Sequence, residues 1–336
     1  MRVCILHRFP KEEIEQTNAS FPYLLRDGVD VKTFKSFNRF NPKLKLLKSI
    51  WWVFTAWTRT VFRNYDVIYC DDSFPWYPIL VKLTSPKSKV VLRLGDLHLM
   101  YYCDGFAYKI LHWFELIGWR LADRILAISQ TMQLHIASQL SDIKIYNVPD
   151  PVDPKFFNHP RIKLGERPIV MFHGTLTKNK GLNRLMRCAM RMPEIDFVII
   201  GEGEELQQLK DQGLSNVEFK GWVSYETITN HLTCADIGIA MRSWNRGNDY
   251  VVTSPWLQYN ALGIPCIATR RKVFTDMNYL WQFDSTEELV KLIKQILENP
   301  PTPYWRDYVH KNHDARKIGE EIWSHLLSSV NQSPKN

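Results

Sequence analysis

Disulfide patterns, long apolar runs and a signal peptide are all missing from this sequence. The six cysteines are dispersed, with no C-x-x-C pair and no zinc-binding spacing, so we expect reduced core thiols. The first segment, MRVCILHRFP, is charged too early for a signal peptide. No stretch reaches the ~18–20 uninterrupted apolar residues of a membrane span. These absences predict a cytoplasmic protein, either soluble or resting on the inner face of a membrane.

The size and charge of the chain indicate the class of protein and the kind of partner. The chain has 336 residues, of which 45% are hydrophobic, and this is enough for large buried cores. The length favours one or two α/β domains. A formal net charge of +8 favours anionic partners such as nucleotide phosphates, acidic lipid headgroups or nucleic acid.

Short apolar runs alternate with longer helical patterns, which is typical of βαβ units and a parallel sheet. We expect helices at Pro42–Phe62, Ala107–Ala122, Gln130–Ser138 and Ile318–Val330, and others that begin near Gly181, Glu204, Ser224 and Pro255. The predicted strands are Arg2–Leu6, Val29–Phe34, Asp66–Cys70, Lys89–Leu94, Arg124–Ile128, Lys144–Val148, Ile169–His173, Asp196–Gly201, Val217–Lys220, Ile237–Ala240 and Pro265–Ala268.

The strand pattern stops and restarts around a polar, proline-rich segment, Pro149–Pro168, which we interpret as an interdomain linker. The expected domains are residues 1–155, residues 156–310, and a C-terminal helical segment over 311–336 that returns toward the first domain. Two Rossmann-like halves with parallel sheets that face a central cleft would bind ligands in that cleft.

The segment IVMFHGTLTKNKGLNRLM predicts a strand, a glycine-containing loop and a helix. Lys180 stands directly before the predicted helix start. Backbone N–H groups at a helix N-terminus and an adjacent ammonium suit a diphosphate. A plain surface lysine at a helix start is the alternative.

The glycine pattern of a dinucleotide-binding loop is incomplete. In FVIIGEGEELQQL, Gly201 and Gly203 follow a strand, but Leu206 occupies the position of the third glycine. The first βα turn of the chain, HRFPKEE, has no glycine at all. A nicotinamide-dependent oxidoreductase is therefore disfavoured.

The next motifs are VEFKGWVSYETI, CADIGIAM, a polar loop RSWNRGNDYVVTSP and the helical segment WLQYNALGIPCIAT. Ser254 and Pro255 mark the helix start. Gln258 falls on the first turn, where a side chain can face a ligand over the N-terminus.

In this order the motifs resemble glycosyltransferase family 4, a family of retaining enzymes with the GT-B fold. GTLTKNKG resembles the family's phosphate loop, IIGEGEE its "iiGdGp" turn, and LQYNALGIPCIAT its "l-E-a-x-A-x-G-x-P-v-i-A" segment. ADRILAISQTM and VPDPVDPKFF, in the first half, are similar to "aD-x-v-i-x-v-S" and "p-N-G-v-D-x-x-x-F". The resemblance runs from about Lys89 to Ala268.

The sequence departs from the family at several charged positions. Thr175 replaces the basic residue of the phosphate loop, so Lys180 would act with Lys178 or Arg184. Gln258 replaces the glutamate that binds the donor ribose, and a glutamine still hydrogen-bonds hydroxyls. Tyr250 replaces the glutamate that faces the reacting sugar, and Asp249 is an alternative carboxylate. The family's first-domain histidine falls on Gly95, with Asp96 and His98 beside it.

The resemblance implies transfer of a hexose from a UDP- or GDP-linked sugar to a glycan, lipid-linked or protein-linked acceptor, with retention. No D-x-D motif for a metal ion occurs near a strand end apart from Cys70-Asp71-Asp72, so we expect transfer without metal and without a cofactor besides the nucleotide sugar. Candidate catalytic residues are Asp96, His98, Asp249 and Tyr250. Candidate donor-binding residues are Gly174, Thr175, Lys180, Gly201, Glu202, Gly221, Trp222, Val223, Ser254 and Gln258.

The first half carries aromatic residues beside basic ones, in PKLKLLKSIWWVFTAWTRTVFRNYD and YYCDGFAYKILHWFELIGWR. Such helices suit a lipid headgroup layer, although packing on the sheet explains most of the aromatics as well. Two other functions stay open: a degenerate sugar-nucleotide or glycan-binding protein on the same fold, and a nucleic-acid-binding protein, for which the sequence contains no recognition motif.

Overall fold

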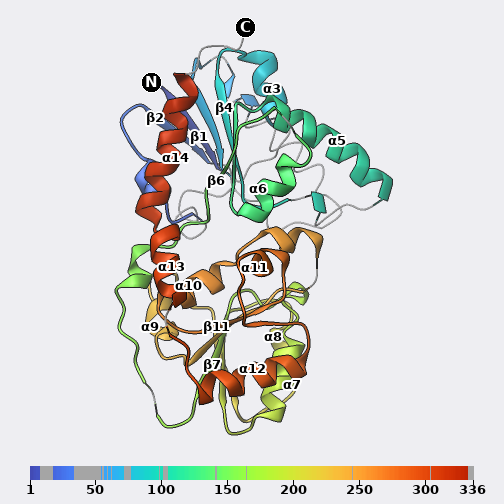
Figure 1. Ribbon diagram of the computed structural model, residues 1–336, viewed down its shortest axis with the longest axis vertical. Coiled ribbons are helices and arrows are strands. Elements are labelled where there is room, and N and C mark those ends of the chain that lie inside the picture. The colour runs from blue at the N-terminus through green and yellow to red at the C-terminus, as the bar shows by residue number, and fades with distance from the viewer. Residues whose placement is uncertain are drawn as a thin grey trace. The chain divides into compact units, whose positions relative to one another are not determined.

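Figure 1 presents the computed structural model of the chain. It describes residues 1–7, 18–33, 54, 57–58, 60–61, 63–71, 77–97, 99–100, 105–140, 142–163, 165–243, 245–302 and 304–331. The candidate His98 and most of the predicted helix Pro42–Phe62 lie outside these residues.

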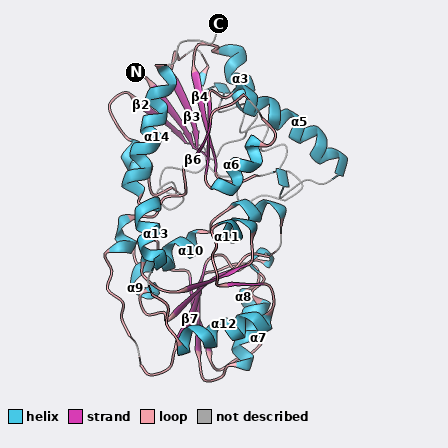
Figure 2. Ribbon diagram, in the orientation of Figure 1, coloured by secondary structure: helices cyan, strands magenta, loops and turns pink. Residues whose placement is uncertain are grey.

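The chain divides into two compact units. The first unit comprises Met1–Pro151 together with Ala315–Asn336, and the second comprises Val152–Asp314. Each unit contains a six-stranded sheet, and in both sheets every neighbouring pair of strands is parallel. Figure 2 shows helices flanking each sheet. The α/β class predicted from the alternating pattern is confirmed.

The first sheet has the order β2-β1-β3-β4-β5-β6. The strand order reverses between β1 and β3, whose carboxyl ends carry His7 and Asp71 as register partners. Its strands are β1 (Val3–His7), β2 (Val29–Thr33), β3 (Val67–Asp71), β4 (Lys89–Leu94), β5 (Arg124–Ala127) and β6 (Ile145–Asn147). Its helices are η1 (Phe21–Leu24), α3 (Tyr77–Thr84), α5 (Gly105–Leu121), α6 (Gln130–Ala137) and α14 (Ala315–Val330).

The second sheet has the order β12-β11-β10-β7-β8-β9, which reverses between β7 and β10. Its strands are β7 (Ile169–His173), β8 (Asp196–Ile200), β9 (Val217–Gly221), β10 (Ile237–Ala240), β11 (Cys266–Thr269) and β12 (Gln282–Phe283). Its helices are η3 (Pro154–Phe157), η4 (Lys178–Lys180), α7 (Asn183–Arg191), α8 (Leu206–Lys210), α9 (Ile228–Leu232), η5 (Arg246–Tyr250), α10 (Ser254–Ala261), α11 (Lys272–Asp276), α12 (Thr286–Glu298) and α13 (Tyr304–His313).

The C-terminal helix α14 belongs to the first unit. Its apolar residues, Ile318 and Ile322 among them, join Val3, Ile5 and Val67 in one buried cluster. Residues two apart in a strand face the same side of the sheet, so Val3 and Ile5 present one continuous apolar face for the helix. Burial of this face holds α14 on the first sheet.

Two segments differ from the sequence interpretation. The proline-rich segment read as a linker contributes Val152 and Phe156 to a buried cluster of the second unit, so its first half is part of that unit's core. The segment before the last helix, for which no helix was predicted, contains α13, because Val309 and the aromatic Trp305 pack on the same cluster. None of the described helices is long and apolar enough to cross a membrane.

Candidate functional site

The carboxyl edge of the second sheet contains the predicted phosphate loop. Ligands of open parallel sheets bind beyond the carboxyl ends of the strands, where the strand order reverses. In this sheet the reversal lies between β7 and β10. The loops that follow these two strands touch, since Ser243 N donates a hydrogen bond to Asn179 O at 2.6 Å.

Three glycine turns meet at this edge. Gly174 N donates to Ile200 O at 3.0 Å, and Gly201 N donates to Gly221 O at 2.8 Å. Gly201 has φ +136°, and a Cβ at this residue would stand 1.9 Å from Gly174 O. Only glycine permits this approach. The structure therefore brings together Gly174, Gly201, Glu202 and Gly221, all of which the sequence analysis selected.

Lys180 ends the short helix η4, and Gly181 follows in the left-handed conformation with φ +68°. Helix α7 begins at Asn183, two residues later than predicted. Lys180 is half-buried, and its charge contributes to lowering the pKa of His173, so the two side chains lie near each other. An ammonium group thus borders the glycine turns.

His173 was not selected from the sequence. It ends β7 and is only 8% exposed, and its Nε2 lies 2.6 Å from Gln258 Oε1. Burial lowers the pKa of His173 to about 4, although the Gln258 contact opposes the shift. Nε2 therefore donates to Gln258, which leaves Nδ1 as a buried acceptor with no partner. A polar residue that ends a buried strand was the available signal, but a lone histidine has no spacing that predicts its role.

The His173–Gln258 pair links the end of β7 to α10. With Oε1 engaged by the imidazole, the Gln258 amide N–H groups are the polar groups left for a ligand. The Tyr259 ring packs against His173 at a centroid distance of 4.9 Å, and its hydroxyl donates to Met171 O. The carboxamide is therefore held by a fixed, neutral imidazole rather than by a charge.

The other donor-binding candidates of the second unit differ in their exposure to solvent. Thr175 and Ser254 are exposed, and Trp222 is 67% exposed after the third glycine turn. Val223 packs against the apolar core of this unit, so its side chain is structural.

Asp249 and Tyr250 lie in η5, next to the start of α11. The Asp249 carboxylate accepts from Lys272 N at 3.5 Å. Burial raises the pKa of Tyr250, and the nearby Asp249 raises it further.

In the first unit, Asp96 is half-buried in the loop after β4. The sequence analysis missed a buried ionic cluster at this sheet's edge. Asp71 accepts from Asn18 Nδ2 at 2.6 Å and pairs with Arg93 at 3.2 Å and His7 at 3.3 Å. The sequence interpretation placed Asp71 in a loop after the strand, whereas it is the last residue of β3. The available sequence signal for this cluster was the presence of polar residues at the ends of the buried apolar runs of β1 and β3.

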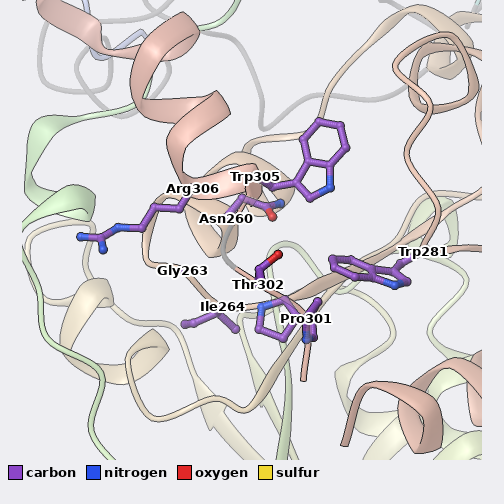
Figure 3. A pocket seen from close by; sticks show the side chains of 9 residues that line it. Asn260, Gly263, Ile264, Trp281, Pro301, Thr302, Trp305 and Arg306 are labelled. Carbon is purple, nitrogen blue, oxygen red and sulfur yellow. The ribbon is translucent and has the colours of Figure 1, made fainter. Parts of the chain in front are cut away.

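A small pocket lies at the opposite edge of the second sheet. Gly263 and Ile264, which precede β11, and Trp281, which precedes β12, line it together with Trp305 and Arg306 (Figure 3). It therefore lies away from the predicted phosphate loop. Among the described residues, no group of three or more His, Cys, Asp or Glu side chains is arranged to hold a metal ion.

Two six-stranded parallel sheets in successive units define the GT-B fold. Sucrose-phosphate synthase from Thermosynechococcus elongatus has this architecture, with a TM-score of 0.75 at 13% identity, covering 99% of this chain and 100% of that one. Anabaena Alr3699/HepE, solved in complex with UDP and glucose, gives 0.67 at 15% identity, covering 98% and 100%. At this identity the likeness concerns the fold.

Residues 155–316 match the family described as glycosyl transferases group 1, and this segment is nearly the whole of the second unit. The chain is also similar to the GDP-mannose-dependent monoacylated alpha-(1-6)-phosphatidylinositol monomannoside mannosyltransferase of Corynebacterium glutamicum. Identity is 24% over 201 residues, which cover 54% of this chain and about half, 52%, of that relative.

Proposed function

We propose that this chain transfers a hexose from a UDP- or GDP-linked sugar to a glycan, lipid-linked or protein-linked acceptor, with retention and without a metal ion. In this proposal the second unit binds the donor and the first binds the acceptor. The observation that carries it is the set of glycine turns beside Lys180 at the β7–β10 reversal, inside the segment that matches glycosyl transferases group 1.

The chemistry of that edge fits a nucleotide diphosphate. Glycine turns let backbone N–H groups approach phosphate oxygens closely, and Lys180 adds a charge. Transfer from a sugar diphosphate needs stabilisation of the leaving diphosphate more than it needs a base. Two of the compared proteins point to the choice of nucleotide: the Corynebacterium relative is GDP-mannose-dependent, and Alr3699/HepE is solved with UDP.

A thermal-shift screen with UDP, GDP, ADP and their sugar conjugates tests the donor site. Ligand at ~100 Kd stabilises the folded state by about 2.7 kcal/mol. Lys180→Ala should weaken nucleotide binding about tenfold or more, because a charged contact contributes about 1.5–3 kcal/mol. Lys294→Ala, at an exposed position of α12, is the matched control. If no nucleotide stabilises the wild-type protein, the proposal fails.

Catalysis needs a separate test, because Gln258 and Tyr250 stand where the resembled family has carboxylates. The competing proposal is a sugar-nucleotide or glycan-binding protein that has lost activity, and the neutral His173–Gln258 pair favours it. Slow release of free sugar from the bound donor, without acceptor, would exclude a pure binder. Tight donor binding with no hydrolysis and no transfer to glycan or lipid-linked acceptors would support one.

On the acceptor side, the proposal places the protein on the cytoplasmic face of an anionic membrane, which it contacts without crossing. On α5, Phe106, Ile110 and Trp113 follow helical spacing and are 78%, 44% and 56% exposed. The helix has one acidic residue, Glu115, which is buried and bonded to His112. The exposed charges of α5 are therefore basic, as a helix in a headgroup layer requires.

Sedimentation with vesicles of anionic lipid tests this face. Trp113→Ser with Phe106→Ser should reduce the bound fraction several-fold, since each aromatic residue removes apolar area from water on binding. Leu280→Ser, at an 83% exposed apolar position of the second unit, should leave binding unchanged. Equal binding of both variants would rule out α5 as the contact.

A further inference from the structure

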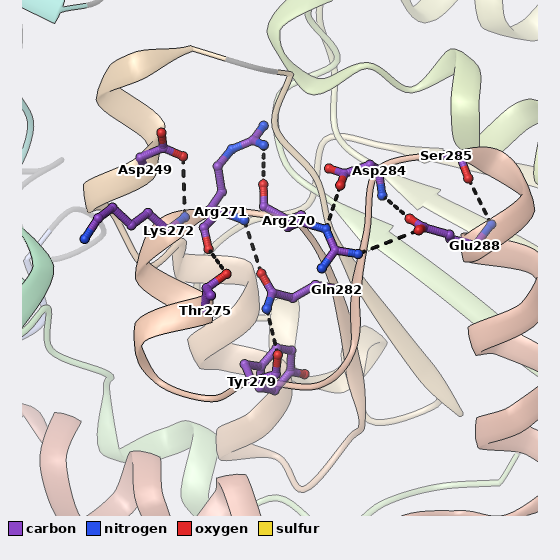
Figure 4. Close-up of polar contacts among 10 residues, drawn as sticks. All are labelled: Asp249, Arg270, Arg271, Lys272, Thr275, Tyr279, Gln282, Asp284, Ser285 and Glu288. Atoms are coloured by element: carbon purple, nitrogen blue, oxygen red, sulfur yellow. Dashed lines mark hydrogen bonds and ion pairs between the residues drawn. The ribbon is translucent and has the colours of Figure 1, made fainter.

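Arg270 and Arg271 follow β11 as neighbours but have opposite surroundings. Arg270 is exposed, and its guanidinium pairs with Asp284 at 2.6 Å and Glu288 at 3.7 Å. Arg271 is only 8% exposed. Figure 4 shows the two guanidinium groups pointing apart, with Arg270 directed toward the two acids.

The guanidinium of Arg271 has only neutral acceptors. Nη1 donates to Arg270 O, Nη2 donates to Arg242 O at 2.5 Å, and the buried Nε has no partner. Among the described residues, no carboxylate lies within 4.0 Å of this guanidinium. Burial of a cation without an anionic partner is costly, and a buried N–H without an acceptor adds to the cost.

Charges of both signs lie near Arg271. Burial lowers the pKa of Arg271; the carboxylates of Asp249 and Asp284 oppose this shift, and the smaller effects of Arg184 and Arg242 add to it. Asp284 is itself bonded to Arg270. Asp249 accepts from Lys272 N, and neither acid pairs directly with the Arg271 guanidinium.

This cluster lies beside the predicted phosphate loop. Nη2 of Arg271 contacts Arg242 O, and the next residue, Ser243, donates to Asn179 O at 2.6 Å. Because Arg242 O and Ser243 N belong to one peptide group, the guanidinium lies within about 8 Å of the Asn179 carbonyl, one residue before Lys180. Arg184, on the first turn of α7, follows the same loop.

We infer that Arg271, with Arg184 and Arg242, forms an oxyanion site for a phosphoryl group at the β7–β10 reversal. A phosphoryl group provides the anionic, bidentate partner that a planar guanidinium prefers. Arg271 would supply, near Lys180, the guanidinium contact with the phosphoryl group that the uncharged Thr175 cannot make. Assigning this phosphoryl group to the donor diphosphate rests on the proposed function, whereas the oxyanion site itself does not.

Isothermal titration of wild type, Arg271→Gln and Arg270→Gln tests the site. The probes are inorganic pyrophosphate, the nucleoside diphosphate that binds the wild type, and the matching nucleoside. Arg271→Gln should weaken pyrophosphate and the diphosphate about tenfold and leave the nucleoside unchanged, because one charge-assisted contact is lost. Arg270→Gln removes the same positive charge outside the cluster and should have no such effect.

The outcomes separate the sources of the phosphoryl group. If Arg271→Gln weakens binding of pyrophosphate but not of the nucleoside diphosphate, the oxyanion site is retained but belongs to another phosphorylated ligand. Pyrophosphate binding that depends on Arg271, with no nucleotide binding by the wild type, would overturn the proposed function alone. Equal affinities for Arg271→Gln and Arg270→Gln would overturn the inference. If Arg271→Gln does not fold, Arg184→Gln, at a half-buried position, should reduce pyrophosphate binding about threefold, and no reduction would overturn it.

Discussion

Replacing Gly201 with alanine should open the contact between the first two glycine turns of the second unit. The added methyl would stand 1.9 Å from Gly174 O, so the two backbones must separate. Separation breaks the hydrogen bonds from Gly174 N to Ile200 O and from Gly201 N to Gly221 O. At about 1 kcal/mol each, with about 1–2 kcal/mol for a non-glycine residue at φ +136°, unfolding should be easier by about 3–4 kcal/mol.

Urea unfolding monitored by circular dichroism measures this change. The corresponding decrease in Tm is roughly 10 °C for a unit of this size. Gly213→Ala is the matched control, because Gly213 has φ +63° and no atom within 4 Å of the added Cβ. It should cost only about 1 kcal/mol. If Gly201→Ala and Gly213→Ala unfold at the same urea concentration, the close approach does not restrict residue 201 and the reasoning is wrong.

Three other predictions concern stability. The pKa of His173 is about 4 in the folded state, against about 6.5 unfolded, so stability falls as pH decreases through this range. From pH 7 to pH 5 the wild type should lose about 2 kcal/mol more than His173→Asn in urea unfolding, and identical losses would refute the shift. Arg93→Met leaves Asp71 buried without its cation and should cost about 3–5 kcal/mol by the same assay, so a loss under 1 kcal/mol would contradict an ionic role. Ser129→Ala removes the N-cap bond to Met132 N and should cost about 1 kcal/mol, whereas Ser129→Asp should retain stability.

The strands were the most predictable elements. Apolar runs such as Ile169–His173 and Ile237–Ala240 were identified with the bounds that the structure has, because strands buried on both faces are continuously hydrophobic. Helix α13 was missed, since its polar sequence with Pro301 and Pro303 nearby resembles a loop, and its helical form depends on packing against the core.

The sequence by itself determined the α/β class and the glycine turns, because local periodicity and the backbone freedom of glycine are properties of neighbouring residues. Only the tertiary structure decided the charges and partners at the β7–β10 edge. His173 and Gln258 are 85 residues apart, and Arg271 and Arg242 are 29 apart. No local pattern encodes such pairs, since they meet only when parallel strands bring distant loops to one edge of a sheet.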